Sequence, residues 1–137
     1  MVLAAGSGRT ALHGFLYARA GFPGMLVCFT FEAKPGKEAE FERLLNNPEA
    51  ARKIARLMGA SRNSLFLKGG RMVRVFEFPE GKKPISLGEL AKTDKGIEAF
   101  LRALGPIVRD GFDIDVPGSL DSFNARVALP VAYDVLP

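Results

Sequence analysis

The chain has 137 residues, 47% of them hydrophobic and 25% charged, a balance that predicts one globular domain rather than disorder. The net charge of +4 includes no basic cluster interleaved with aromatic residues, and no apolar run approaches the roughly 20 residues that span a bilayer. We therefore expect neither a nucleic-acid nor a membrane partner. A single cysteine excludes an internal disulfide and makes a cytoplasmic location the default expectation.

Residues 1–24 differ from the rest of the chain, because they are rich in glycine, lack acidic residues and show no clear hydrophobic period. They also lack the charged start and the long apolar centre of a secretory signal, although a transit peptide is an alternative. We interpret them as a flexible N-terminal extension, or as the product of a start codon placed upstream of Met25. The domain is expected over residues 25–137.

A strand and a helical region are the first predicted elements of this domain. Residues 25–33, MLVCFTFEA, are β-rich and apolar on both faces, as is typical of a strand covered on both sides. Residues 37–60 place apolar side chains at helical spacing. Pro48 is expected to divide them into two helices, since proline suits the first turn of a helix, and Gly59 is the expected stop.

Residues 63–78, NSLFLKGGRMVRVFEF, predict a β-hairpin whose central Gly-Gly supplies the positive φ angles of a tight turn. Alternation along the second strand places Arg74 on one face with Met72, Phe76 and Phe78. An arginine among apolar side chains either reaches the rim of the sheet or lines a pocket. Arg74 is therefore the first candidate functional residue.

The second half of the chain predicts a loop, a helix, an acidic connector, a short helix and a final strand. These segments are residues 79–88, 94–108, 109–118, 119–129 and 130–137, in that order. Thr93 or Asp94 can cap the longer helix, and Ser119 can cap the shorter one. The connector lacks the spacing and the terminal glutamate of an EF-hand, so we expect a solvated loop or a lid rather than a calcium site.

The predicted order from residue 25 is β-α-β-β-α-β, with one additional short helix before the last strand. This order predicts an α+β, ferredoxin-like fold with an antiparallel sheet. Helices cover only one face of such a sheet, yet the strand at residues 25–33 is apolar on both faces. We therefore expect a homodimer in which the sheets of two copies face each other.

Several stretches of residues 25–135 resemble the SchA/CurD-like family of aromatic polyketide and spore-pigment pathways. They are FTFEAKPGKEAEF, SLFLKGGRMVRVFEF, AFLRALGPIVRD and DSFNARVALPVAYDV, and the strand MVRVFEF is the most specific part. The family is similar to the dimeric α/β-barrel proteins, which include cofactor-independent antibiotic-biosynthesis monooxygenases and polyketide cyclases. The resemblance implies a dimeric α/β barrel and an aromatic polyketide substrate. Residues 1–24 and the loop PEGKKPISLGE depart from the family's usual form.

The composition gives no support for a cofactor or a metal. His13 and Cys28 are the only histidine and cysteine, and they lie in unrelated segments, so we expect neither a metal nor a haem site. Residues 6–14 are glycine-rich, but no strand precedes them and no lysine follows where a phosphate-binding loop needs one. With no cofactor expected, the substrate must contribute much of any chemistry.

Arg74 is the leading catalytic candidate, with Glu32 and Tyr133 as candidates for proton transfer. Oxygenation or cyclisation of aromatic polyketides passes through phenolate or enolate anions, and a desolvated guanidinium stabilises such an oxygen. The alternative for Arg74 is a structural ion pair with Glu32 or Glu77 across the dimer. Glu32 acts as a base only if burial raises its pKa, and an exposed glutamate and a core tyrosine are the commoner outcomes.

Five further residues on the predicted strands are candidates for substrate binding. They are Thr30, Ser64, Phe66, Met72 and Phe76. The polar members would contact substrate oxygens, whereas the aromatic ones would either floor a flat pocket or belong to the core.

The leading expectation is a cofactor-independent monooxygenase that acts on a polyphenolic intermediate of aromatic polyketide biosynthesis. A polyketide cyclase, a non-catalytic polyketide-binding dimer and a purely structural dimer stay open. The amount of free space inside the fold, and the side chains that line it, would distinguish these four possibilities. A pocket with Arg74 and a proton-transfer group favours an enzyme, a pocket without such a group favours binding, and a packed interior favours a structural role.

Overall fold

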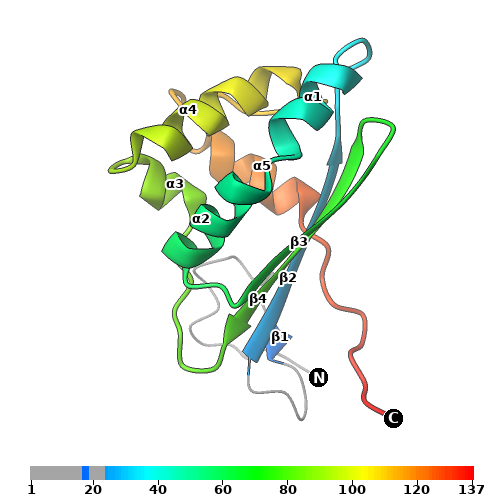
Figure 1. Cartoon of the computed structure of the whole chain (residues 1–137), viewed down its shortest axis with the longest axis vertical. Coiled ribbons are helices and arrows are strands. Elements are labelled where there is room, and N and C mark those ends of the chain that lie inside the picture. The colour runs from blue at the N-terminus through cyan, green and yellow to red at the C-terminus, as the bar shows by residue number, and fades with distance from the viewer. Residues whose placement is uncertain (1–16, 19–23) are drawn as a thin grey trace.

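The computed structural model describes residues 17–18 and 24–137, and four strands, five α-helices and one short 3-10 helix lie in that part of the chain (Figure 1). The strands are β1 (Tyr17–Ala18), β2 (Gly24–Glu32), β3 (Arg62–Lys68) and β4 (Arg71–Pro79). The helices are α1 (Glu38–Leu45), α2 (Pro48–Met58), α3 (Leu87–Ala91), α4 (Lys95–Leu104), η2 (Gly105–Ile107) and α5 (Ser119–Val127). The predicted N-terminal extension, with His13 in it, lies outside the described residues apart from β1.

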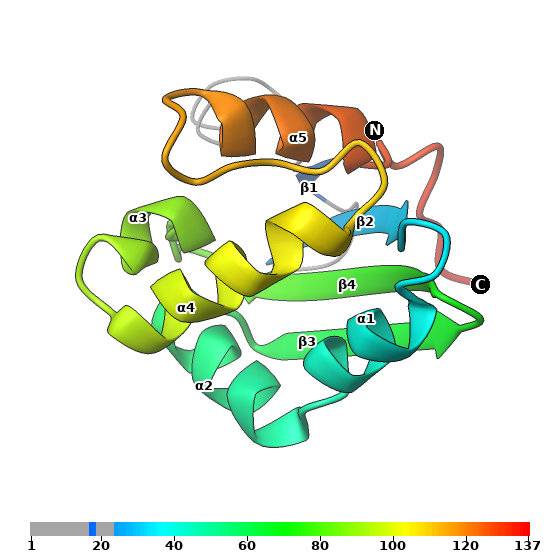
Figure 2. The ribbon, with the colours of Figure 1, turned by 90° about the horizontal axis from the view of Figure 1, so that it is seen from above.

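The strands form one antiparallel sheet in the order β1-β2-β4-β3. The predicted two-glycine turn joins β3 to β4, and Gly69 and Gly70 have φ angles of 57° and 79°, which glycine adopts without steric cost. Arg74 in β4 pairs with Leu65 of β3 on one side and with Phe29 of β2 on the other. Figure 2 shows the helices gathered on one side of this sheet, with α5 near β2 and α2 near β3.

The division of the first helical region into α1 and α2 is confirmed. Pro48 opens α2, and the side-chain oxygen of Asn47 caps it by accepting a hydrogen bond from the Ala50 amide at 3.1 Å. Gly59 ends α2 in the left-handed conformation, with φ at 85°. Local sequence therefore sets both ends of this helix.

The caps of the later helices are confirmed in one case and wrong in the other. Asp94 caps α4, because its side chain accepts a hydrogen bond from the Ile97 amide at 3.0 Å. Ser119 does not cap α5. Its hydroxyl accepts from the Asp113 amide at 2.9 Å instead, and Gly118 is the N-cap residue. None of the helices in the described part of the chain has the length and apolar character that crossing a bilayer requires.

The core lies between the helices and one face of the sheet. Because Phe29 pairs with Arg74, the odd-numbered residues of β2 and the even-numbered residues of β4 share this face. Phe41, Phe78 and Val108 are completely buried in it. The prediction that the face of Arg74 is apolar is confirmed, and this face is the one that the helices cover.

No helix of residues 24–137 covers the other face, which we call the open sheet face. It carries Leu26 and Cys28 from β2, Val73 and Val75 from β4 and Phe66 from β3. The Phe66 side chain is 63% exposed. The prediction that the first strand is apolar on both faces is confirmed, and the predicted dimeric barrel would bury this face against a second copy.

The predicted last strand over residues 130–137 is wrong, because the structure has no strand there. Antiparallel pairing with β2 begins, with Ala128 opposite Phe29 and the Leu129 amide donating to the Cys28 carbonyl at 2.9 Å. The chain then leaves the sheet and runs away from it, as Figure 1 shows in red.

β1 accounts for where that pairing stops. Continued in the same register, Val131 would lie opposite Leu26, and Tyr17 already holds that position. The α+β class and the antiparallel sheet are therefore confirmed, and the arrangement fits the ferredoxin-like class, but β1 takes the edge predicted for the C-terminal segment.

Candidate functional site

A cavity of about 100 Å³ lies between the helices and the covered face of the sheet. It is lined mainly by aromatic and aliphatic side chains from β2, β4, α2, α4 and α5. The aromatic ones are Phe29, Phe31, Phe76, Phe78, Phe100, Phe112 and Phe123. Phe29 and Phe76 meet edge to face, with their ring centroids 6.4 Å apart. Such a lining suits an aromatic ring, since aromatic pairs favour edge-to-face and offset-stacked contacts.

Among the described residues, Arg74 is the only charged side chain that lines this cavity. It comes from the middle of β4, between its cross-strand neighbours Phe29 and Leu65. Burial among apolar groups lowers the pKa of Arg74 to about 10, so the guanidinium still carries its charge at neutral pH. The cavity therefore contains one poorly solvated positive charge.

The hydrogen-bond partner of Arg74 is neutral. Its Nη1 donates to Oδ1 of Asn63, and Nδ2 of Asn63 donates to the Ala51 carbonyl of α2 at 3.1 Å. The guanidinium carbon lies 5.9 Å from the centroid of the Phe76 ring. Within residues 24–137 no carboxylate pairs with Arg74, and neither Nη2 nor Nε has a bonded acceptor. Two donor groups and a full charge are thus left for a ligand.

The structure does not bring the three predicted catalytic side chains together. Glu32 lies at the end of β2 on the opposite face, where its carboxylate pairs with Arg109 at 3.3 Å and with Arg71 at 3.8 Å. Tyr133 lies beyond α5 and is 80% exposed. The predicted alternative, an ion pair of Arg74 with Glu32 or Glu77 across a dimer, stays a prediction. Within one chain both glutamates lie on the opposite face of the sheet from Arg74.

The predicted binding residues are divided between the two faces. Met72 and Phe76 line the cavity beside Arg74. Thr30, Ser64 and Phe66 belong to the opposite face, and the Thr30 hydroxyl donates to the Met72 carbonyl at 2.9 Å. Within one chain, the predicted site residues therefore lie on both faces of the sheet.

The hairpin turn contains a signal that could have excluded Ser64 and Phe66. A two-residue turn pairs Lys68 with Arg71, and counting back along both strands pairs Leu65 with Arg74. Residues directly opposite each other share a face, so the immediate neighbours of Leu65 lie on the other face from Arg74. No comparable local signal exists for Thr30, because the pairing of β2 with β4 is long-range.

Three polar residues of the site were not predicted. Asn63 positions Arg74, whereas Ser86 and Asn124 line the cavity. Ser86 lies at the end of the predicted 79–88 loop, where its hydroxyl accepts a hydrogen bond from the Glu89 amide at 3.2 Å and caps α3. Serine three residues before a glutamate is a helix-start pattern, so α3 could have been found from the sequence.

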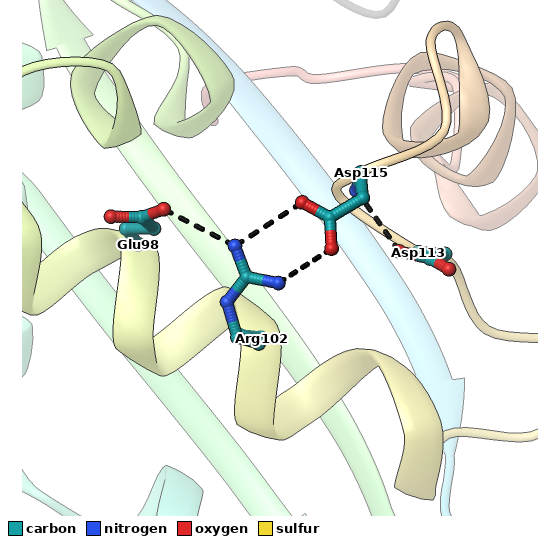
Figure 3. Close-up of polar contacts among 4 residues, drawn as sticks. All are labelled: Glu98, Arg102, Asp113 and Asp115. Carbon is teal, nitrogen blue, oxygen red and sulfur yellow. Dashed lines mark hydrogen bonds and ion pairs between the residues drawn. The ribbon is translucent and has the colours of Figure 1, made fainter.

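A polar clamp holds the connector that leads into α5, which supplies one wall of the cavity. Arg102 of α4 donates to both carboxylate oxygens of Asp115, at 2.7 and 3.2 Å, and to Glu98 at 3.2 Å (Figure 3). The Asp115 amide donates to Asp113 at 2.9 Å. The acidic connector is thus tied to α4 through Asp115.

The lining defines what chemistry the cavity can support. Apart from Arg74, its polar side chains are Ser86 and Asn124, and no carboxylate, imidazole or phenol of the described residues lines it. No group of three or more histidine, cysteine or acidic residues within that part of the chain could hold a metal. The cavity can therefore bind an aromatic anion and stabilise its charge, while any proton must move to or from water or the substrate itself.

Two curated Streptomyces proteins are similar to this chain. A 42.8 kDa protein in the whiE locus of Streptomyces coelicolor is 35% identical over 107 residues, which are 76% of this chain and 26% of that protein. The polyketide synthase CurD of Streptomyces cyaneus is 30% identical over 109 residues, 77% of this chain and 29% of that protein. The chain belongs to the SchA/CurD-like family.

This assignment confirms the resemblance found in the sequence. The chain spans between a quarter and three tenths of the length of these two relatives, so the match concerns one part of each. No protein-family model matches the chain, and no solved structure does.

Proposed function

We propose that this member of the SchA/CurD-like family acts in aromatic polyketide biosynthesis, by binding a polyphenolic intermediate in the cavity with an ionised oxygen at Arg74. The relatives named above support the pathway class. The observation that carries the proposal is the charge of Arg74, which lacks a carboxylate partner within the described residues and lies among phenylalanine side chains.

The surroundings of Arg74 would strengthen its effect on a bound anion. An interaction between charges is larger where water is excluded, and a donor already held in place needs no reorganisation during the reaction. Asn63 supplies that restraint by bonding Nη1 and the α2 backbone together. Removing one such fixed donor from an enzyme typically lowers the rate by about a hundredfold to a thousandfold.

Cofactor-independent oxygenation is the reaction that fits this cavity best. A phenol ring of the polyphenol loses one proton to water, and Arg74 stabilises the resulting phenolate. The ring carbon para to this oxygen reduces molecular oxygen and forms a carbon–oxygen bond, the peroxide anion takes a proton from water, and the hydroperoxide loses water to leave a quinone. This reaction needs one charge stabilised by the protein, and its protons are exchanged with water. An aldol cyclisation exchanges protons in the same way, but it also needs a polyketide chain folded so that two of its carbons meet inside a cavity of about 100 Å³, so a cyclase is the less favoured enzyme.

A non-catalytic role is the second candidate, and the polar lining favours it. Ser86 and Asn124 do not exchange protons near neutral pH, and no other proton-transfer group of the described residues lines the cavity. A protein that holds a reactive polyketide anion in place would need only the apolar walls and Arg74. A measurement of turnover therefore distinguishes the oxygenase from the non-catalytic role.

A second copy of the chain is the partner proposed for the open sheet face. Phe66, Val73 and Val75 form a continuous apolar surface there, and such surfaces usually mark contacts. In that arrangement the two cavities lie on the outer sides of the paired sheets, and each copy keeps its own Arg74.

The experiment is aerobic and anaerobic incubation of the purified chain with 1-naphthol, with Arg74→Met and Arg71→Met alongside. Oxygen-dependent quinone formation without added cofactor, reduced at least about a hundredfold in Arg74→Met only, would establish the oxygenase. Arg71 is the matched control, since it is an exposed arginine of the same strand on the other face. Saturable binding without turnover would leave the non-catalytic role.

A further inference from the structure

The cavity is small for the molecules that the proposed function assigns to it. Its volume is about 100 Å³. Sites that enclose a drug-sized ligand have roughly 300–1,000 Å³, and an apolar cavity of about 150 Å³ binds benzene, so this cavity has room for one ring at most. A fused three-ring polyphenol therefore cannot lie inside without displacing the surrounding helices.

Resting on the proposed function, we infer that the cavity takes a single phenolic ring of its ligand, inserted end-on as the phenolate, while the rest of the molecule stays outside. The oxygen meets the unbonded Nη2 and Nε of Arg74. The ring packs among the phenylalanine side chains that surround the guanidinium. The ligand class is then any molecule with an accessible terminal phenol, including monocyclic phenols.

The charge state of the ring follows from the partners of Arg74. The guanidinium has lost much of its hydration, and its one side-chain partner, Asn63, brings no negative charge. A buried cation without a counter-charge is unfavourable, so an anion that neutralises it gains more than a neutral phenol of the same shape. Binding is expected to lower the pKa of the phenol.

A phenolate fits this cavity better than an aromatic carboxylate. Its charge is spread into the ring, which the phenylalanines accept, whereas a carboxylate concentrates its charge on two oxygens. Those oxygens need several donors once they leave water. Nη1 is already committed to Asn63, and the other polar lining groups are the amide of Asn124 and the hydroxyl of Ser86. Benzoate is therefore the competing ligand in the test.

The test is a pH titration of 4-nitrophenol, whose phenolate absorbs visible light, with and without an excess of the full chain. The pKa of the bound phenol should fall by roughly one to three pH units. Arg74→Met should abolish the fall. Asn63→Asp should also abolish it, because a carboxylate then neutralises the guanidinium while Arg74 stays in place. Arg71→Met should leave it unchanged.

Two further binding measurements test how many rings enter the cavity and which class of anion it prefers. Full burial of the four additional carbons of 4-nitro-1-naphthol would tighten binding by about a hundredfold or more. We expect a gain below tenfold, and a hundredfold gain would overturn the one-ring inference. The inference that the site binds the ring as a phenolate would be contradicted by either of two results. Benzoate would bind more tightly than 4-nitrophenolate, or the pKa of the phenol would not fall on binding.

These outcomes are independent of turnover. A lowered pKa of 4-nitrophenol without oxidation of 1-naphthol would support the phenolate site and contradict the oxygenase. Oxidation of 1-naphthol that depends on Arg74, without any effect on 4-nitrophenol, would support the oxygenase and contradict the phenolate site.

Discussion

Arg74 and Asn63 form a hydrogen bond between two neighbouring strands, in which the guanidinium donates to the side-chain amide oxygen. Asn63 also donates to the Ala51 carbonyl at 3.1 Å, so the same side chain links β4, β3 and α2. The guanidinium is restrained by a neutral group. It therefore keeps its full charge for the cavity, where a carboxylate in the same place would have cancelled it.

Asn63→Asp changes this relationship by charge alone. The aspartate is nearly isosteric and would pair with Arg74, so we expect the chain to fold and its affinity for aromatic anions to fall about tenfold or more. Isothermal titration with 4-nitrophenol above its pKa measures the loss. Arg71→Met is the matched control, and an affinity equal to that of the wild type would show that Arg74 is not the anion-binding group.

Phe41→Ala should cost about 3–5 kcal/mol of the free energy of unfolding, because a large aromatic side chain is removed from a fully buried position. Phe41 packs edge to face on Phe31, with centroids 5.9 Å apart, and it does not line the cavity. Urea unfolding measures the change. Leu136→Ala, at an exposed position, should lie within about 0.5 kcal/mol of the wild type. Equal effects of the two substitutions would contradict the core described above.

Asp115→Asn should reduce stability at neutral pH but not in acid. The hydrogen bonds and the charge of Arg102 lower the pKa of Asp115 in the folded chain. The pair therefore stabilises the fold above the unfolded carboxyl's pKa of about 3.9, and this contribution is lost as the pH falls through the lower folded value.

Urea midpoints of the wild type and Asp115→Asn should differ at pH 7 and converge in acid. Glu80→Gln, an exposed change in the loop after β4, is the control and should show no such convergence. A difference between the wild type and Asp115→Asn that is the same at both pH values would rule out the charge of Asp115 as its source.

Phe66→Glu tests the proposed second copy on the open sheet face. The side chain is 63% exposed within one chain, so the substitution should leave the fold of that chain intact. A glutamate buried opposite its own copy would lose solvation and repel its equivalent, so we expect sedimentation equilibrium to show a dimer for the wild type and a monomer for the variant. A wild-type protein that is monomeric in the same experiment would contradict the proposed homodimer.

A variant that begins at Met25 should change the C-terminal segment. Without Tyr17, the edge of β2 at Leu26 is free, and the pairing that starts at Ala128 can continue to Val131. Pro130 does not prevent this, because in this register its nitrogen points away from β2. Hydrogen exchange should show the Val131 amide protected in the variant and faster in the full chain. Equal exchange rates would mean that β1 does not limit the pairing.

The local features of the chain were predictable from the sequence. Asn47 and Pro48 divide the helices, Gly59 ends the second one, and the Gly-Gly turn sets the hairpin. Each depends on backbone preferences and hydrogen bonds within a few residues, which the sequence specifies directly. Alternation likewise placed Arg74 with Met72 and Phe76, because it concerns a single strand.

The predicted site combined residues of different strands that lie on opposite faces of the sheet. Thr30 and Arg74 both lie at even positions of strands with two apolar faces, so alternation alone could not tell that they face opposite ways. The pairing of Phe29 with Arg74 decides this, and it joins residues that are far apart in the chain. The proton-transfer role given to Tyr133 likewise depended on a strand that did not form.

The sequence by itself therefore determined which side chains share a face of each strand, where helices begin and end, and the family to which the chain belongs. Only the tertiary structure decided which faces of different strands meet and which segment takes the edge of β2. It also placed the charge of Arg74 under the helices rather than between two sheets. The physical reason is that strand register is fixed by packing between distant segments, and a shift of one residue moves every side chain to the other face.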